Sequence, residues 1–150
     1  MSEKIMNARK RIAVIAHDRK KAELIDWATD NKEILSKHIL YATGTTGKML
    51  EEALHIEVVK LLSGPLGGDQ QVGSLIAQGE MDMMIFFWDP MESQAHDTDV
   101  KALLRVGAVW NIPIACDRAT ADFLVTSPYM NTEYVSNLPD YSSYLNRKII

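Results

Sequence analysis

Five short apolar runs, separated by longer stretches of mixed polar and apolar residues, dominate the pattern along this chain. They span Ile12 to Ala16, Ile39 to Ala42, Ile56 to Leu62, Met83 to Trp88 and Ile112 to Cys116. Near-continuous apolar runs of this length are typical of strands that are buried on both faces of a parallel sheet. We therefore predict a strand at each of the five runs.

The stretches between the runs carry apolar residues at helical spacing. The residues that share a helix face are Leu24, Ile25 and Ala28; Val72, Leu75 and Ile76; and Val100, Leu103, Leu104 and Gly107. Alternating strands and helices indicate βαβ units. The predicted fold class is α/β: a three-layer, doubly wound, mostly parallel sheet of about five strands, flavodoxin-like or Rossmann-like. From Ser127 onward the sequence predicts a loop that ends in a short helix from Tyr141 to Lys148.

Composition narrows the class of protein. A chain of 150 residues suits one domain with a sizeable core, which we place over residues 1–150. The net charge of −4 argues against nucleic-acid binding by bulk attraction. No apolar run approaches the roughly 20 residues that span a membrane, and the first residues lack a signal-peptide core. The single cysteine, Cys116, excludes an intrachain disulfide, and we expect a cytoplasmic protein.

Polar motifs follow four of the five predicted strands. They are His17 and Asp18; Thr43 to Gly47; Ser63, Gly64 and Asp69; and Asp89 with His96, Asp97, Thr98 and Asp99. Open α/β sheets bind ligands at the carboxyl ends of their strands. The four motifs are therefore expected to converge on one edge of the sheet and to form a single site there.

The motif Thr43-Gly44-Thr45-Thr46-Gly47 offers three hydroxyls and flexible backbone at the start of a predicted helix. Such a loop can bind a phosphate with N–H and O–H donors. The alternative is a turn with a threonine N-cap. Ser63 and Gly64 at the next strand end favour the phosphate site, to which Lys21 could add a cation. Taken alone, Lys21 is better explained as a solvated surface lysine.

Asp69 lies among glycines beside this expected anion site, where a carboxylate is unfavourable unless it has chemistry to perform. His17 and His96 add candidate acid–base groups. The rival is a metal site made of His17, His96, Asp69 and Asp89, but the chain has no His-x-x-x-His or Cys-x-x-Cys pair. Asp18, Asp89 and Asp99 are equally consistent with helix caps or supports.

Nucleophilic catalysis has little support, because Ser63 lacks a Gly-x-Ser-x-Gly motif and no activating motif follows Cys116. The remaining groups are one carboxylate, imidazoles and a phosphate site. This set suits proton abstraction next to a carbonyl, with donors directed at the oxyanion that forms.

Five segments together resemble the methylglyoxal synthase family. They are His17-Asp18, residues 41–47, the Ser63-Gly64-Pro65-Leu66-Gly67-Gly68-Asp69-Gln70-Gln71 stretch, Phe86-Phe87-Trp88-Asp89-Pro90, and residues 99–105. The likeness runs in unbroken order from about residue 10 to about residue 127. It implies conversion of dihydroxyacetone phosphate to methylglyoxal and inorganic phosphate, with no metal or organic cofactor, by a homohexamer. Phosphate would then be both product and possible inhibitor, and neither a nucleic acid nor a membrane would be a partner.

The resemblance also implies roles for single residues. Asp69 matches the catalytic carboxylate, and His96 matches the residue that donates to the enediolate oxygens. His17 matches a second substrate contact. The positions that match the family's phosphate contacts are Lys21, Thr43, Gly44, Thr45, Thr46, Ser63 and Gly64. Asp18, Asp89 and Asp99 would support the site.

The terminal segment departs from the family pattern. The family supplies an arginine there across a subunit contact, and the aligned position here is Lys148, with Arg147 immediately before it. Lysine lacks the bidentate fork of arginine, so this replacement is not neutral. Either Lys148 or Arg147 could make the contact.

Two other functions stay open at this point. A regulatory phosphate-binding module would keep the phosphate site without needing Asp69 and His96. A triose phosphate isomerase would have a similar site and differ in its product.

Overall fold

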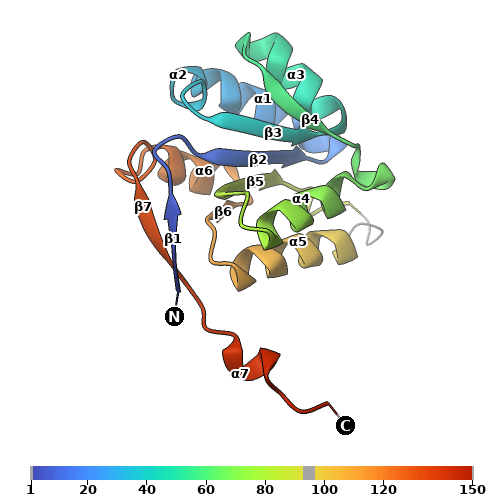
Figure 1. Cartoon of the computed structure of the whole chain (residues 1–150). Helices are drawn as coiled ribbons and strands as arrows, with labels where there is room; N and C mark the ends of the chain where they lie inside the picture. Colours follow the sequence, from blue (N-terminus) through green and yellow to red (C-terminus); the bar gives the residue numbers. More distant parts are fainter. Residues whose placement is uncertain (1, 93–96, 150) are drawn as a thin grey trace.

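The computed structural model describes residues 2–92 and 97–149. At its centre is a parallel five-stranded sheet with the order β4-β3-β2-β5-β6 (Figure 1). The strands are β2 (Arg11–Ala16), β3 (Ile39–Thr43), β4 (Val58–Leu61), β5 (Met83–Phe87) and β6 (Ile114–Ala115). The predicted α/β class and the five parallel strands are confirmed.

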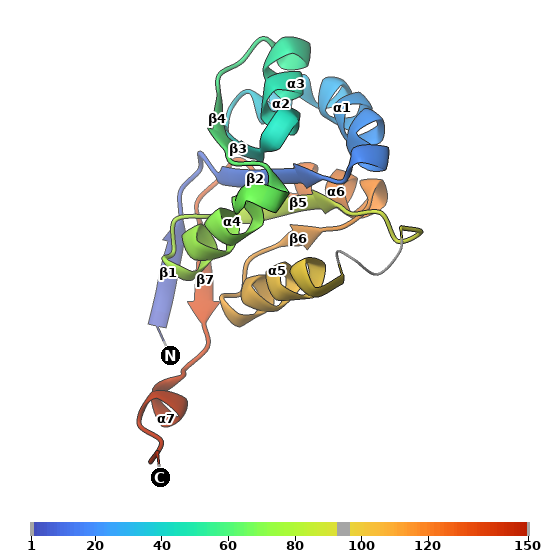
Figure 2. The same cartoon turned by 90° about the vertical axis from the view of Figure 1, so that its right-hand side faces the viewer.

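Helices cover both faces of the sheet and complete three layers (Figure 2). One face carries α1 (Lys21–Asp30), α3 (Gly44–Leu54) and α6 (Arg118–Val125), and the other carries α4 (Gly68–Ala77) and α5 (Asp97–Val109). A single helical turn, α2 (Lys32–Leu35), follows α1. Three of these helices carry the apolar stripes predicted from the sequence.

Strand β2 shows why the apolar runs are continuous. Ile12 and Val14 pack with the helices of one face, while Ala13 and Ile15 pack with those of the other. Successive side chains of a strand point to opposite faces, so a strand covered on both faces needs apolar residues throughout. The run from Ile12 to Ala16 meets that need.

The strand boundaries differ from the apolar runs by one or two residues. β4 begins at Val58 instead of Ile56, and β6 is confined to Ile114–Ala115. Pro113 precedes β6 and has no N–H for the ladder, although its carbonyl accepts from Met84 N. The apolar runs therefore show which residues are buried, whereas the backbone hydrogen bonds of the sheet determine where each strand begins and ends.

The predicted loop from Ser127 onward is wrong in part. The segment Tyr134–Leu138 forms strand β7, which pairs antiparallel with β1 (Ser2–Met6). Ser2 lies opposite Leu138, and Met6 lies opposite Tyr134. β7 alternates exposed and covered positions, and most of β1 is exposed, so neither strand produces an apolar run. Their pairing joins the two ends of the chain and could not be found from local sequence.

The terminal helix is shorter than predicted. Only α7 (Ser142–Leu145) is helical within the predicted span from Tyr141 to Lys148. The segment that carries α7 runs away from the sheet and its helices in both views (Figures 1 and 2). Its first part is anchored, because Tyr141 packs its ring on Trp110 and donates its hydroxyl to the Val109 carbonyl.

Candidate functional site

The carboxyl ends of the five parallel strands lie at one edge of the sheet. His17 follows β2, Gly44 follows β3, Ser63 follows β4 and Asp89 follows β5. The central neighbours β2 and β5 lead into helices on opposite faces, α1 and α5. A crevice for a ligand is expected at such a switch point, so the sheet brings the four predicted motifs to the edge where α/β proteins bind ligands.

The predicted phosphate loop spans the junction between β3 and α3. Thr43 is the N-cap of α3, yet no cap hydrogen bond from its side chain is seen among the described residues. Gly44 has φ +52°, a left-handed conformation that favours glycine. Thr46 is buried. Thr43 therefore holds the N-cap position that the simple alternative predicts, but no hydrogen bond from its side chain closes the turn in the described part of the chain.

Gly44 brings the phosphate loop against the loop after β4. A Cβ on Gly44 would lie 3.2 Å from Ser63 Cβ, and the Gly44 N–H donates to the Leu62 carbonyl. The amino terminus of the 11-residue helix α3, which favours an anion, is thus next to Ser63 and Gly64. The two predicted phosphate segments share one place in the fold.

Asp69 is the second residue of α4 and so lies in the first turn of that helix. A short 3-10 helix, η2 (Gly64–Leu66), precedes it. A Cβ on Gly64 would be 3.6 Å from Asp69 Oδ1, so the carboxylate lies directly over Gly64. The candidate base therefore borders the candidate phosphate site.

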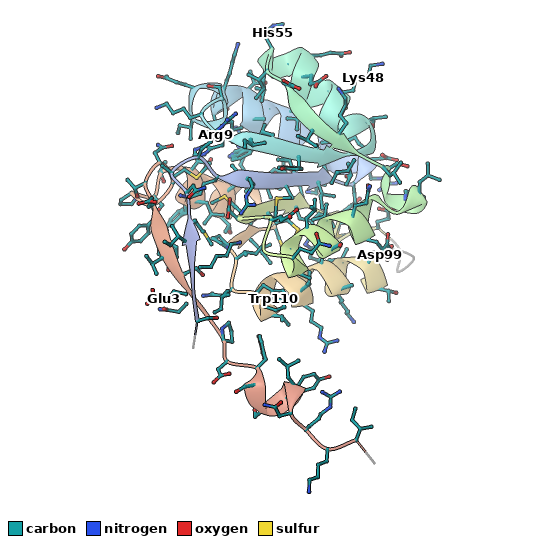
Figure 3. The ribbon with its side chains drawn as sticks, in the orientation of Figure 1. Glu3, Arg9, Lys48, His55, Asp99 and Trp110 are labelled. Atoms are coloured by element: carbon teal, nitrogen blue, oxygen red, sulfur yellow. The ribbon has the colours of Figure 1, made fainter. Side chains whose placement is uncertain are left out.

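Asp99 shares a cavity with Asp69. The cavity has a volume of about 130 Å³ and is lined from α4 by Asp69, Gln70 and Gly73, and from α5 by Asp99, Ala102, Leu103 and Val106. Figure 3 shows Asp99 near the start of α5, on the side that faces α4. The structure thus brings these two predicted acids together.

The two glycines before Asp69, Gly67 and Gly68, shape the turn that leads into α4. The Gly67 amide donates to the Gly64 carbonyl and the Gly68 amide donates to the Ser63 carbonyl. A Cβ on Gly68 would lie 1.9 Å from the Leu62 oxygen, so only glycine fits there. The amides of Gly67 and Gly68 therefore close a tight turn at the start of α4.

His17 and Asp89 are in direct contact across the switch point. The Asp89 N–H donates to His17 Nδ1 at 3.0 Å, and the imidazole stacks edge-on against Phe86. Because Nδ1 accepts a hydrogen bond, the proton of the neutral ring is on Nε2. Glu92 Oε2 lies 3.8 Å from Nδ1, and in this tautomer that contact is not an ion pair.

The Asp89 carboxylate is buried. Oδ1 accepts from the Met91 N–H, whereas Oδ2 has no hydrogen-bond partner within residues 2–92 and 97–149. A buried acceptor without a donor costs free energy. A ligand hydroxyl or a water would meet this requirement, so Asp89 is well placed to support the site.

Lys21 and Asp18 form an ion pair at the start of α1. Asp18 is exposed and belongs to the short 3-10 helix η1 (Asp18–Lys20), while most of the Lys21 side chain is covered. Lys21 follows β2 in the chain and begins α1 on the carboxyl side of the sheet. In the described part of the chain it makes no hydrogen bond to the loop from Thr43 to Gly47.

Three predicted residues are not placed at the edge. His96 lies outside the described residues. Arg147 donates to the Tyr144 carbonyl and covers the Tyr144 ring at 3.8 Å. Arg147 and Lys148 both belong to the segment that leaves the body of the molecule, so they do not join this site within one chain.

The metal site considered from the sequence includes His96, which lies outside the described residues. Among the described residues no three His, Cys, Asp or Glu side chains are arranged to hold a metal ion. Burial raises the pKa of the Cys116 thiol, which disfavours the reactive thiolate. No helix in the described segments is both long and apolar enough to cross a membrane.

A second cavity, of about 280 Å³, lies at the opposite edge of the sheet, where β2 and β5 begin. The buried Lys10 is on its wall and donates to the Asn7 and Thr132 carbonyls. Burial lowers the pKa of Lys10. None of the predicted site residues lines this cavity, so it is separate from the candidate active site.

Sequence reasoning missed one residue of the site, Gln71. Its Oε1 accepts from the Leu62 N–H at 2.8 Å and so joins α4 to the end of β4. The Gly-Gly-Asp-Gln-Gln motif contains Gln71, but spacing alone does not show that its side chain turns back toward the strand.

Known proteins share this fold and much of this sequence. The MGS-like domain family matches residues 23–116. Methylglyoxal synthase of Aliivibrio fischeri (strain ATCC 700601 / ES114) is 51% identical over 146 residues, 97% of each chain. Methylglyoxal synthase of Saccharophagus degradans is 56% identical over 138 residues, 92% of this chain and 90% of that protein.

A crystal structure of methylglyoxal synthase from Elizabethkingia anophelis NUHP1 superposes with a TM-score of 0.94 at 56% identity, covering 100% of this chain and 99% of the other. Such identity over nearly the full length of both chains shows the family. The chain belongs to the methylglyoxal synthase family.

Proposed function

We propose that this protein converts dihydroxyacetone phosphate to methylglyoxal and inorganic phosphate. The observation that carries the proposal is the Asp69 carboxylate over Gly64, next to the helix terminus and hydroxyls of the phosphate loop. A base and an anion site side by side are what a carbonyl compound with a phosphate group requires. Membership of the family supports the same reaction.

The phosphate of the substrate binds between the two loops that meet at Gly44 and Ser63. The groups that hold it are Lys21, Thr43, Gly44, Thr45, Thr46, Ser63 and Gly64. Lys21 supplies a charge, and the other groups supply hydroxyls and backbone donors at the start of α3. This grip fixes the reacting carbon relative to Asp69.

Asp69 removes a proton from the carbon that carries the hydroxyl, and the electron pair forms an enediolate. His17, with its proton on Nε2, and His96 donate to the enediolate oxygens. The electrons then expel phosphate by breaking the C–O bond of the carbon on the other side of the former carbonyl carbon. The resulting enol takes up a proton at carbon to become methylglyoxal. Asp18, Asp89 and Asp99 support these groups, and no cofactor enters any step.

An isomerase with the same groups would differ in one respect. Elimination requires the C–O bond to overlap the π system of the enediolate, whereas isomerisation requires that overlap to be avoided and a proton to return to the neighbouring carbon. The product therefore separates the two reactions. A regulatory module, the other alternative, would bind phosphate without turnover.

We further propose a homohexamer in which the terminal segment of one chain contacts the phosphate site of another through Arg147 or Lys148. Exposed apolar side chains on that segment, Tyr144, Leu145 and Ile149, support a contact with a second copy. A cytoplasmic location is also proposed. It accords with the single, half-buried Cys116, and fractionation of the source cells tests it.

The substitution Asp69→Asn tests the proposal, because it removes the base and leaves the phosphate loops intact. We expect kcat to fall by about 10³-fold, within the range that general-base catalysis supplies. Binding of inorganic phosphate, measured by calorimetry, stays within about threefold, since its donors remain.

The matched control is Asp30→Asn, an exposed carboxylate of α1 that pairs with Arg118 away from the site. Its kcat should equal that of the unmodified chain. Near-normal turnover in Asp69→Asn would remove Asp69 from the role of base.

A further inference from the structure

One residue, Leu62, links the candidate base to the phosphate loop through its backbone. Its N–H donates to Gln71 Oε1 at 2.8 Å, and its carbonyl accepts from the Gly44 N–H at 3.3 Å. Gln71 lies two residues after Asp69 on α4, and Gly44 begins α3. A continuous chain of hydrogen bonds therefore runs from the helix of the base to the helix of the phosphate loop.

Packing alone does not fix Leu62. The residue is 50% exposed, so the core does not hold it. The backbone of α4 touches it from one direction, because Gly68 lies against the Leu62 oxygen. The Gln71 side chain adds the second attachment, at the Leu62 nitrogen. The peptide units on both sides of Leu62 are thus held from α4.

We propose that Gln71 is a positioning residue, which holds the Asp69 carboxylate at a set distance from the phosphate loop by binding the Leu62 N–H. This inference rests on the proposed reaction. Gln71 touches neither the proton that is removed nor the phosphate. It acts through Leu62, by keeping the start of α4, which carries Asp69, in place relative to the phosphate loop.

Such a role has a measurable consequence. A base that lies on one loop and a phosphate held by another must keep their separation, and a displacement of about 1 Å can cost about 100-fold in rate. Loss of the Gln71 contact leaves the Gly44 N–H bonded to the Leu62 carbonyl, so the phosphate loop keeps its own support. The rate should therefore suffer more than phosphate binding.

The experiment compares three variants in steady-state assays with dihydroxyacetone phosphate. Gln71→Leu removes the acceptor, and we expect kcat to fall about tenfold while KM and the Kd of inorganic phosphate stay within about threefold. Gln71→Glu keeps an acceptor oxygen at the same reach, in a helix turn that favours negative charge, and should recover most of kcat. Gln78→Leu is the matched control, an exposed glutamine near the end of the same helix.

Each result decides the matter. Unchanged kcat in Gln71→Leu, equal losses in Gln71→Leu and Gln71→Glu, or a parallel loss of phosphate binding would overturn the positioning role. Absence of methylglyoxal from the unmodified chain would overturn the proposed reaction instead. Thermal unfolding confirms that the variants are folded. If Gln71→Leu does not fold, Gln71→Asn takes its place, because its amide is one methylene too short to reach Leu62.

Discussion

Because residue 68 is a glycine and has no Cβ, α4 can begin directly against the end of β4. A Cβ there would be 1.9 Å from the Leu62 oxygen, and the nearest atoms belong to the backbone of Leu62 and Ser63, which cannot move aside easily. Gly67, with φ +107°, supplies the turn that precedes it. The position of Asp69 thus depends on two neighbouring glycines whose own amides are used inside the turn.

His38 is a second residue whose surroundings decide its chemistry. The ring is buried, Nδ1 accepts from the Lys10 N–H at 2.9 Å, and Nε2 lies 2.9 Å from Asn131 Oδ1. Burial lowers the pKa of His38, and the nearby positive charge of Lys10 acts in the same direction. The folded protein therefore keeps His38 neutral, because a proton on Nδ1 would break the bond to Lys10.

This lowered pKa predicts a pH-dependent stability. The unfolded chain binds a proton on His38 near its ordinary pKa of about 6.5, while the folded chain does so only at lower pH. The stabilisation is complete above about pH 6.5 and is lost as the pH falls toward the folded pKa. Urea unfolding should show a larger loss of unfolding free energy between pH 7.5 and 5.5 in the unmodified chain than in His38→Gln. Parallel losses would contradict the assignment, since the other three histidines are common to both chains.

At the scale of elements, the parts with a local signature could be predicted and the paired termini could not. Apolar runs such as Ile12 to Ala16 predict strands because both faces of the sheet are covered. Helix α3 follows from the Thr-Gly motif that begins it. The ribbon of β1 and β7 depends on a pairing across 128 to 136 positions, and neither strand alone has a continuous apolar run.

The terminal element carries its own prediction. The segment beyond Tyr141 leaves Tyr144, Leu145 and Ile149 exposed to solvent. Exposed apolar side chains do not stabilise a separate monomer, but they can contact a second chain. Light scattering should give the full chain about six times its 16.9 kDa mass. A chain that ends at Ser142 keeps the Tyr141 anchor on Trp110 and should form smaller assemblies. A monomeric full chain, or an unchanged mass after truncation, would refute the hexamer or the role of the segment.

At the scale of the whole molecule, the two edges of the sheet have different tasks. The amino edge holds a buried charge cluster in which Asp82 binds Arg11 and Lys4. Burial acts to raise the pKa of Asp82, but hydrogen bonds from Arg11 outweigh it, and the pKa lies below its usual value. At the carboxyl edge lie groups such as Asp69, Asp89 and His17, which are better suited to binding a ligand than to stabilising the fold.

Much of the candidate site could be predicted because parallel strands bring their carboxyl ends together. That rule placed His17, Gly44, Ser63 and Asp89 on one edge without any knowledge of side-chain contacts. The rule says nothing of where a side chain turns. The bond between His17 and the Asp89 N–H, and the return of Gln71 to Leu62, depend on atomic positions that no spacing in the sequence reveals.

The measurement that tests the account most directly is an incubation with dihydroxyacetone phosphate in the presence of a metal chelator, with methylglyoxal and inorganic phosphate followed together. We predict that both products appear at equal rates, because a proton abstracted by Asp69 leads to elimination of phosphate. Formation of glyceraldehyde phosphate without phosphate release would mean isomerisation. Tight phosphate binding with no product would mean a regulatory module, and either result would contradict the proposed function.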